Sequence, residues 1–277
     1  MIRVATEKAE SSWLGRRIAG LWVRPESLQA PEPIVLLHEA LGSIGQWTKR
    51  RRDAGPIDVA SELAAATGRA VLAFDRLGHG ASDGFAAERH DAYLREEGAR
   101  ALPSILDGFG VERAVLLGHS DGGSIALVFA GHHPDRCIGL VSEAAHVIVE
   151  DITLAGIRQA EDVYARPDQR LAQGLAKYHG DKTDALFRAW SETWTRASFS
   201  DLDLCPDIEP ATAPALIIQG VDDEYGSPEQ VRLIAQHYGK AGGGGAQTWL
   251  VPDCRHIPHF EAHEIVLGRI AAFIKAL

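Results

Sequence analysis

The sequence has few cysteines, no long apolar run and no excess of basic residues, and each absence excludes a class of protein. Its 277 residues include three cysteines, an odd number with no C-x-x-C pair, so neither a disulfide framework nor a zinc site is indicated. No apolar run approaches the roughly 18 residues of a transmembrane helix, and the N-terminal region lacks the pattern of a secretory signal. We expect a soluble cytoplasmic protein in which Cys137, Cys205 and Cys254 pack as small apolar residues.

Acidic residues outnumber basic ones, 38 to 28, and the formal net charge is −10. Nucleic acid and anionic membranes are repelled by such a charge, so neither is an expected partner. Four histidines lack a carboxylate at metal-ligand spacing, and surface or capping roles are expected for them: His132, His133, His259 and His263. We predict no metal and no cofactor, and the sequence leaves the oligomeric state open.

Short apolar runs alternate with helical patterns, which is typical of an α/β fold with a mostly parallel central sheet flanked by helices. An antiparallel pair at the sheet edge is expected from residues 3–8 and 16–23. The expected parallel strands are 33–38, 69–75, 113–118, 137–144, 215–220 and 247–252. The expected helices are 57–67, 91–109, 120–132, 228–238 and 261–277.

A G-x-S-x-G pentapeptide lies between one of these strands and the next helix. Residues 118–122 read Gly-His-Ser-Asp-Gly, after the apolar run 114–117 and before the helical pattern 124–130. A strand that leads through a sharp turn into a helix lifts the serine hydroxyl clear of the backbone. Ser120 is therefore a candidate nucleophile.

Serine needs a base to activate it and an acid to orient that base. Both residue types follow later predicted strands, an acidic turn with Asp222 and Asp223 and then His256. The order serine, acid, histidine is expected of one serine-hydrolase architecture and not of the two unrelated protease ones. Asp222 and Asp223 are competing candidates for the acid.

Two further segments complete a resemblance to a known family. Residues 38–42 read His-Glu-Ala-Leu-Gly after a predicted strand, and residues 75–82 read Asp-Arg-Leu-Gly-His-Gly-Ala-Ser after another. Together with the serine turn, the acid and the histidine, they resemble the α/β-hydrolase fold superfamily, whose corresponding motifs are His-Gly-x and D-x-x-G-x-G-x-S. The resemblance covers nearly all of the chain. It implies an α/β-hydrolase fold and an esterase-like serine hydrolase with a cap.

The resemblance also implies a role for each site residue. Asp223 matches the acid because it is the fourth residue of a G-x-x-D turn at 220–223. His256 is then the base, and the backbone N–H groups of Ala40 and Asp121 form the oxyanion hole that stabilises a tetrahedral intermediate.

Position 39 departs from the family pattern, because glutamate stands where the family normally has glycine. Glycine commonly marks unusual backbone dihedrals or a close approach. Two interpretations stay open for Glu39: a structural role, or a carboxylate that discriminates among substrates. Near an oxyanion hole this carboxylate opposes anionic substrates unless it is paired, and Arg76 is a candidate partner.

About 65 residues with helical patterns separate the strands that end near 144 and begin near 215, far more than an ordinary connection. The resemblance makes this a helical cap over the active site, with the core domain at 1–145 and 211–277 and the cap at 146–210. Substrate contacts are predicted for His146, Trp190, Trp194 and Tyr225 in addition to Glu39. The alternative for the tryptophans is that they pack the cap onto the core.

The predicted function is hydrolysis of a small or medium acyl compound, a carboxylic ester, thioester or lactone, through an acyl-enzyme on Ser120. A capped pocket favours a buried, partly aromatic small molecule over a polymer. Two alternatives stay open: a carbon-carbon bond hydrolase that acts on a ring-cleavage product, and a noncatalytic ligand-binding member of the fold.

Overall fold

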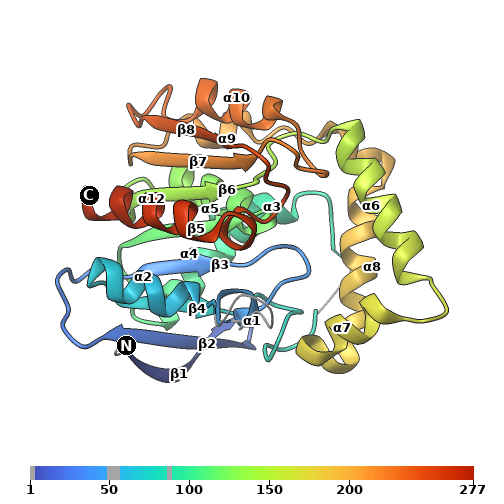
Figure 1. The fold of residues 1–277 in the computed structure, drawn as a ribbon, viewed down its shortest axis with the longest axis horizontal. Coiled ribbons are helices and arrows are strands. Elements are labelled where there is room, and N and C mark those ends of the chain that lie inside the picture. Colours follow the sequence, from blue (N-terminus) through green and yellow to red (C-terminus); the bar gives the residue numbers. More distant parts are fainter. Residues whose placement is uncertain (1–3, 49–56, 86–88) are drawn as a thin grey trace.

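A single eight-stranded sheet forms the centre of the molecule (Figure 1). The structure is a computed structural model that describes residues 4–48, 57–85 and 89–277. The strand order is β1-β2-β4-β3-β5-β6-β7-β8, in which β1, β2 and β4 pair antiparallel and all other neighbours pair parallel. The strands are β1 (Val4–Trp13), β2 (Arg16–Pro25), β3 (Ile34–Leu37), β4 (Val71–Phe74), β5 (Ala114–His119), β6 (Cys137–Glu143), β7 (Ala215–Gly220) and β8 (Ala246–Val251). The predicted fold class and edge hairpin are confirmed.

The central strands are continuous apolar runs because both faces of the sheet are covered. Every residue of β3 is buried. Val35 and Leu37 face one hydrophobic cluster, whereas Ile34 and Leu36 face the other. The sheet is therefore covered by helices on both faces. The parallel strands β3, β5, β6 and β7 end at the same edge of this sheet, so residues that directly follow them are brought together there.

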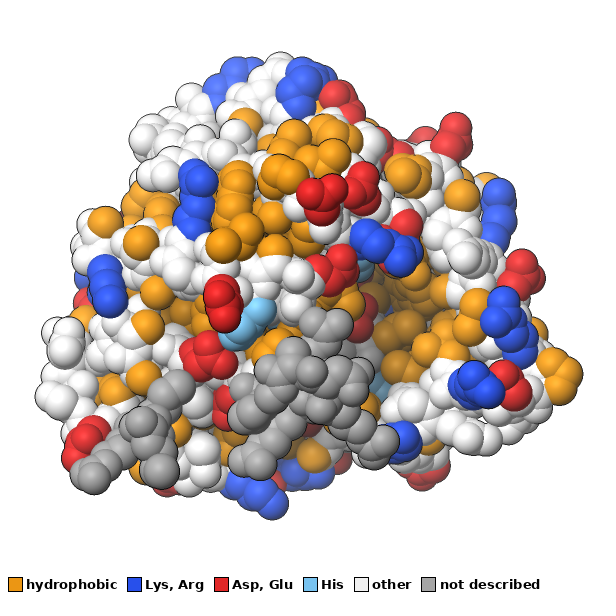
Figure 2. All heavy atoms as spheres, viewed as in Figure 1, with side chains coloured by type: hydrophobic (Ala, Val, Ile, Leu, Met, Phe, Trp, Pro, Cys, Tyr) orange, Lys and Arg blue, Asp and Glu red, His pale blue; other side chains and the backbone are white. Residues whose placement is uncertain are grey.

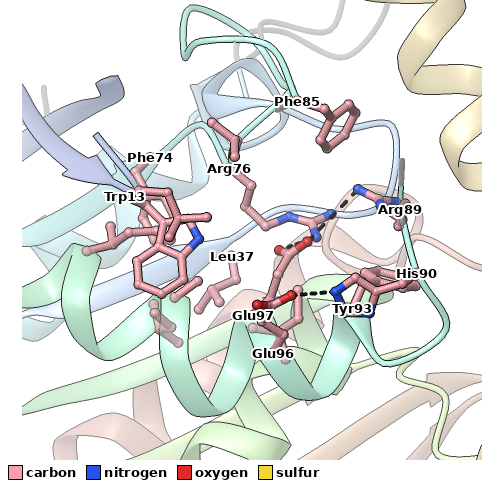
Figure 3. A pocket seen from close by; sticks show the side chains of 16 residues that line it. Trp13, Leu37, Phe74, Arg76, Phe85, Arg89, His90, Tyr93, Glu96 and Glu97 are labelled. Atoms are coloured by element: carbon pink, nitrogen blue, oxygen red, sulfur yellow. Dashed lines mark hydrogen bonds and ion pairs between the residues drawn. The ribbon is translucent and has the colours of Figure 1, made fainter. Parts of the chain in front are cut away.

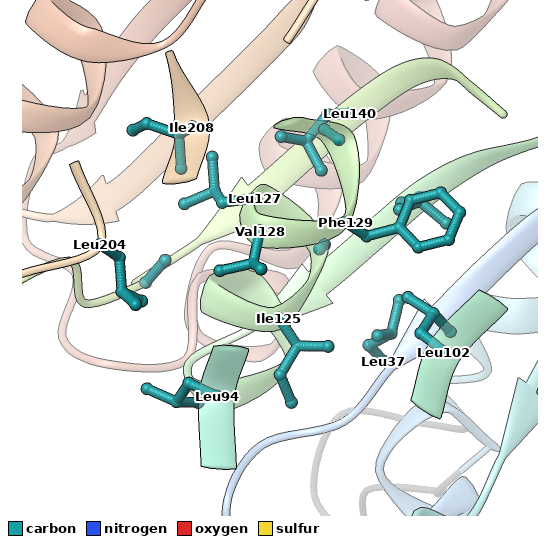
Figure 4. Packing of buried hydrophobic residues seen from close by; sticks show 14 of the residues in the cluster. Leu37, Leu94, Leu102, Ile125, Leu127, Val128, Phe129, Leu140, Leu204 and Ile208 are labelled. Carbon is teal, nitrogen blue, oxygen red and sulfur yellow. The ribbon is translucent and has the colours of Figure 1, made fainter. Parts of the chain in front are cut away.

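One helical layer consists of α1 (Ile44–Thr48), α2 (Val59–Thr67) and α12 (His263–Lys275), with α11 (Pro258–Glu261) before α12. The other contains α3 (Tyr93–Glu96), η1 (Glu97–Ala101), α4 (Leu102–Gly108), α5 (Asp121–His132) and α10 (Pro228–His237). Helix α5 is buried along almost its whole length. Figure 4 shows Ile125, Val128 and Phe129 of this helix packed among leucine and isoleucine side chains of its neighbours.

The connection between β6 and β7 is helical, and we call its helices the inserted helices. They are α6 (Asp151–Tyr164), α7 (Arg170–His179), η2 (Gly180–Lys182), α8 (Thr183–Trp194), η3 (Ala197–Asp201) and α9 (Cys205–Ile208). Helices α6, α7 and α8 stand together at one end of the sheet, whereas α9 packs against α5 (Figure 1). Lys182 Nζ donates to the Gly80 carbonyl at 2.7 Å and His179 Nε2 donates to the Leu41 carbonyl at 3.0 Å, so these helices are attached to loops that follow β3 and β4.

Two predicted helices are divided in the structure. The stretch predicted at 91–109 contains the π-helical turn η1, where Gly98 lies so close to α5 that a Cβ atom would come within 2.7 Å of the Ile125 carbonyl oxygen. The helix predicted to begin at 261 is preceded by the separate turn α11, which begins with Pro258. Packing against a neighbouring helix and the position of a proline set these boundaries.

Candidate active site

The turn between β5 and α5 holds the candidate nucleophile in a strained backbone conformation. Ser120 has φ 54° and ψ −120°, a region that side chains other than glycine rarely adopt. The chain is forced into this turn by close packing: a Cβ atom on Gly118 would lie 2.1 Å from the Gly122 carbonyl oxygen, and one on Gly122 would lie 2.2 Å from the Leu37 carbonyl oxygen. Such strain costs about 1–3 kcal/mol and is concentrated at functional sites.

The candidate nucleophile opens onto a cavity of about 550 Å³ between the sheet and the inserted helices, which we call the central cavity. Figure 2 shows a hollow at this place, with hydrophobic side chains inside and charged side chains around its rim. All predicted site residues except Asp223 line it: Glu39, Ala40, Ser120, Asp121, His146, Trp190, Trp194, Tyr225 and His256. The Ser120 hydroxyl makes no hydrogen bond to another described residue, so it is available to a molecule in the cavity.

His256 is oriented by Asp223, and Asp222 is not involved. The Nδ1–H of His256 donates to Asp223 Oδ1 at 2.8 Å, and the same oxygen accepts from the Tyr225 N–H at 2.9 Å. Asp222 is exposed. With Nδ1 as donor, Nε2 of His256 is an acceptor that bonds to no other group in the described part of the chain. It is thus available as a base toward the central cavity, where hydrogen bonds to a nucleophile often tighten only with substrate bound.

The paired groups shift each other's pKa. Burial alone lowers the pKa of His256, but the hydrogen bond and charge of Asp223 outweigh it and raise the pKa above 6.5. Burial alone raises the pKa of Asp223, and the contact with His256 brings it below its ordinary value. Both shifts favour the ion pair that forms when His256 accepts a proton.

The loop after β3 carries Ala40, which lines the central cavity. The Glu39 carbonyl accepts from His38 Nδ1–H at 2.7 Å and from Arg76 Nη2 at 3.0 Å. Described peptides are all trans, so the Ala40 N–H points opposite to this carbonyl, away from Arg76. It donates no hydrogen bond within the described residues. Asp121 is the first residue of α5, where an N–H has no partner inside the helix.

Arg76 does not neutralise the Glu39 carboxylate, contrary to the pairing considered from the sequence. Its Nη1 donates to Glu97 Oε2 at 2.8 Å, and its Nη2 lies 3.5 Å from Asp121 Oδ2. Figure 3 shows Arg76 turned toward Glu97 in a separate pocket of about 290 Å³, which Ser120 does not line. Asp121 also accepts from Tyr93 Oη at 2.9 Å, so its side chain has structural partners.

The predicted substrate contacts all reach the central cavity, and some of them also hold it together. His146 Nε2–H donates to the Tyr225 carbonyl at 3.0 Å, and the His146 ring lies edge-on to Trp194 with centroids 5.3 Å apart. Trp194 Nε1–H donates to Tyr93 Oη at 2.8 Å. Both tryptophans therefore line the cavity and also pack within the hydrophobic core. Their contact with a substrate stays a prediction.

A second buried histidine–carboxylate pair lies beneath the first and was missed in the sequence. His259, for which a surface or capping role was predicted, is fully buried, and its Nδ1–H donates to Glu143 Oε2 at 2.5 Å. That prediction is wrong for His259. Glu143 ends the buried strand β6, and a carboxylate at the end of a buried apolar strand was the signal that a partner must lie nearby.

Gln46 connects this second pair to both halves of the site. Its Oε1 accepts from the Glu39 N–H at 3.1 Å, and its Nε2 donates to His119 Nδ1 at 2.9 Å and lies 3.4 Å from His259 Nε2. His119 Nε2–H in turn donates to the His256 carbonyl at 2.7 Å. Burial holds the pKa of His119 well below its ordinary value, so it is neutral, as this bonding requires.

Within the described residues, no group of three or more histidine, cysteine or carboxylate side chains is arranged to hold a metal ion. Nor does any helix there have the length and apolarity needed to cross a membrane.

A strained serine between a strand and a helix, together with a histidine paired with an aspartate, is an arrangement typical of the α/β-hydrolase fold. Comparison with known proteins shows the family. The chain belongs to the alpha/beta hydrolase family, whose sequence profile matches residues 34–268.

Individual relatives share about a quarter of their residues with this chain. It is 26% identical over 218 residues to a 2-hydroxy-6-oxo-6-phenylhexa-2,4-dienoate hydrolase of Comamonas testosteroni, covering 70% of this chain and 72% of that protein. It is 25% identical over 282 residues to a 2-hydroxy-6-oxononadienedioate/2-hydroxy-6-oxononatrienedioate hydrolase of Escherichia coli O139:H28, covering 92% of each. The solved structure of a 2-hydroxy-6-oxo-6-phenylhexa-2,4-dienoate hydrolase from Rhodococcus sp. strain RHA1 superposes with a TM-score of 0.75 at 14% identity, over 99% of this chain and all of that one.

Proposed function

We propose that the protein is a serine hydrolase that cleaves a small or medium acyl compound, a carboxylic ester, thioester or lactone, through an acyl-enzyme on Ser120. The observation that carries the proposal is the joint placement of Ser120 and His256 on the central cavity, with Asp223 bonded behind the histidine. A ligand-binding site alone requires neither the strained serine backbone nor the oriented base.

The proposed reaction begins when Ser120 Oγ attacks the acyl carbon and its proton passes to His256 Nε2. The carbonyl oxygen becomes an oxyanion, which the N–H groups of Ala40 and Asp121 stabilise. The tetrahedral intermediate then collapses, and the leaving group departs with the proton from His256. Water attacks the acyl-enzyme, His256 takes its proton and returns it to Ser120, and the carboxylic acid is released.

The inserted helices act in this proposal as a cap, with residues 146–210 as the cap domain. Support comes from Trp190 and Trp194 of α8, which line the central cavity opposite Ser120. A cap of this kind excludes water from the charge that develops in the reaction. The cavity beneath it, of about 550 Å³, limits the size of the substrate.

Hydrolysis of p-nitrophenyl esters of increasing acyl length tests the proposal, with Ser120→Ala as the matched variant. We expect turnover by the native protein, a loss of at least a thousandfold in the variant, and labelling of Ser120 alone by a fluorophosphonate probe, seen by peptide mass. Equal rates for the two proteins remove Ser120 from the mechanism. A native protein that neither turns over esters nor takes up the probe favours the noncatalytic alternative.

Carbon-carbon bond hydrolysis is the second candidate, because the relatives named above are hydrolases of dienoates and dienedioates. The assay is incubation with 2-hydroxy-6-oxo-6-phenylhexa-2,4-dienoate and measurement of benzoate by chromatography. Benzoate release that exceeds ester turnover in kcat/KM would make this the principal activity.

A further inference from the structure

The Glu39 carboxylate is a partly buried acid that lines the same cavity as Ser120 and forms no ion pair with any described residue. It lines the central cavity together with Ser120 and His256. Its backbone N–H and carbonyl are bonded to Gln46, His38 and Arg76, but in the described part of the chain its side-chain oxygens take part in no hydrogen bond or ion pair. A carboxylate held out of water without a partner is costly, and a cationic or hydrogen-bond-donating ligand would relieve that cost.

Among the described residues that line the same cavity, positively charged side chains are scarce. Among its described lining residues the only cationic side chain is Arg255, and Arg255 Nη2 is already paired with Glu224 Oε1 at 2.9 Å. Arg76, the nearest buried cation behind the loop, is engaged by Glu97 and Asp121. A substrate carboxylate placed near Ser120 would therefore meet Glu39, with no free cation among the described lining residues to bind it.

Aromatic rings supply the complementary surface. Trp190, Trp194 and Tyr225 line the cavity along with Glu39, and the Tyr225 ring centroid lies 4.8 Å from that of His256. Aromatic faces attract cations through their quadrupole, and a carboxylate set among aromatic rings is a combination suited to ammonium groups. The same carboxylate and ring faces would repel an anion.

We propose that the central cavity selects acyl substrates that carry a positively charged ammonium group and rejects anionic acyl groups, with Glu39 as the discriminating residue. The inference rests on the proposed function, since it names the substrate class of the same site. It also separates this chain from its named relatives, because dienoates and dienedioates are carboxylates.

Three p-nitrophenyl esters that differ in charge test the selection. The cationic ester is p-nitrophenyl 4-(trimethylammonio)butyrate, its neutral carbon isostere is p-nitrophenyl 5,5-dimethylhexanoate, and the anionic ester is p-nitrophenyl hemiadipate. We expect kcat/KM to be about tenfold or more higher for the cation than for the isostere, and lowest for the anion. In Glu39→Gln the ratio of cation to isostere should fall toward one.

Glu192→Gln is the matched control, because Glu192 is exposed on α8, the helix that supplies both tryptophans, and its substitution changes the net charge equally. The ratio should persist in this control. A native ratio at or below one, or a ratio that Glu39→Gln leaves unchanged, overturns the proposal.

Binding to the Ser120→Ala protein keeps this inference separate from the catalytic proposal. The corresponding p-nitroanilides, titrated by calorimetry, report the charge preference without turnover. Tighter binding of the ammonium anilide than of its isostere, abolished when Glu39→Gln is added, supports the selection even if the native protein hydrolyses none of the esters. Equal binding of the two anilides contradicts it.

Discussion

Two buried histidine–carboxylate pairs lie on either side of His119, and of the two histidines only His256 is among the described residues that line the central cavity. His256 and Asp223 are joined at 2.8 Å, and His259 and Glu143 at 2.5 Å. In the first pair the second ring nitrogen of the histidine is available to the cavity, whereas in the second pair that nitrogen lies beside Gln46. In the proposed function, a histidine–carboxylate pair can therefore serve a reaction when its second ring nitrogen has no partner and the fold when it has one.

The largest effect is expected from exchanging the two histidines for glutamine one at a time. His256→Gln removes the base and should lower kcat by about 10⁴- to 10⁶-fold. His259→Gln should leave kcat within about tenfold but lower the free energy of unfolding by about 2–3 kcal/mol, because Glu143 loses a buried donor. Ester kinetics and urea unfolding of both variants measure the difference. Similar kinetic losses in both would erase the distinction between the pairs.

Substitutions of the carboxylates should separate catalysis from stability in the same way as those of the histidines. Asp223→Asn should lower kcat by about 10⁴-fold, because an amide no longer fixes the tautomer of His256. Asp222→Asn alters an exposed neighbour and is the control. Glu143→Gln keeps an acceptor for His259 and should cost stability more than rate. A large rate loss in Asp222→Asn would show that the wrong acid has been assigned.

The pH dependence of kcat/KM should report the protonation of His256, the histidine of the pair that faces the cavity. His256 acts as a base when it is deprotonated, and its pKa is raised above 6.5, so kcat/KM should fall tenfold per pH unit as the pH drops below that pKa. The same raised pKa stabilises the folded state below pH 6.5, a contribution lost as the pH rises through the pKa of His256. Glu39→Gln should move the kinetic midpoint downward, since the charge of Glu39 helps to raise this pKa. A midpoint below 6.5 in the native protein contradicts the assignment.

The smallest effect is expected at the residue that connects the pairs. Gln46→Leu removes bonds to the Glu39 N–H and to His119, and should lower kcat about tenfold by loosening both the oxyanion loop and the His256 backbone. Thr48→Ala on the same helix is the control, because among the described residues the Thr48 hydroxyl bonds to the Ile44 carbonyl alone. Unchanged kcat in Gln46→Leu would limit Gln46 to a packing role.

The sequence was most informative where the chemistry is local. The serine turn could be predicted because a strand, two glycines and a helix lie within a few residues of Ser120, and the alternation of strands and helices was sufficient for the fold class. The pairing of His259 with Glu143 could not be predicted, because 116 positions separate the two residues and a single histidine or glutamate forms no motif. The sequence also could not predict that Glu39 lines the cavity or that Arg76 pairs with Glu97, because both depend on tertiary packing.

The backbone at position 120 carries a consequence for descent. Its backbone angles, φ 54° and ψ −120°, suit glycine better than serine. A lineage that no longer needed the hydroxyl would relieve this strain by a change to glycine, with the surrounding fold intact. Serine at this position is therefore a marker that can be read in any descendant: where it persists, natural selection has maintained it against the preference of the chain.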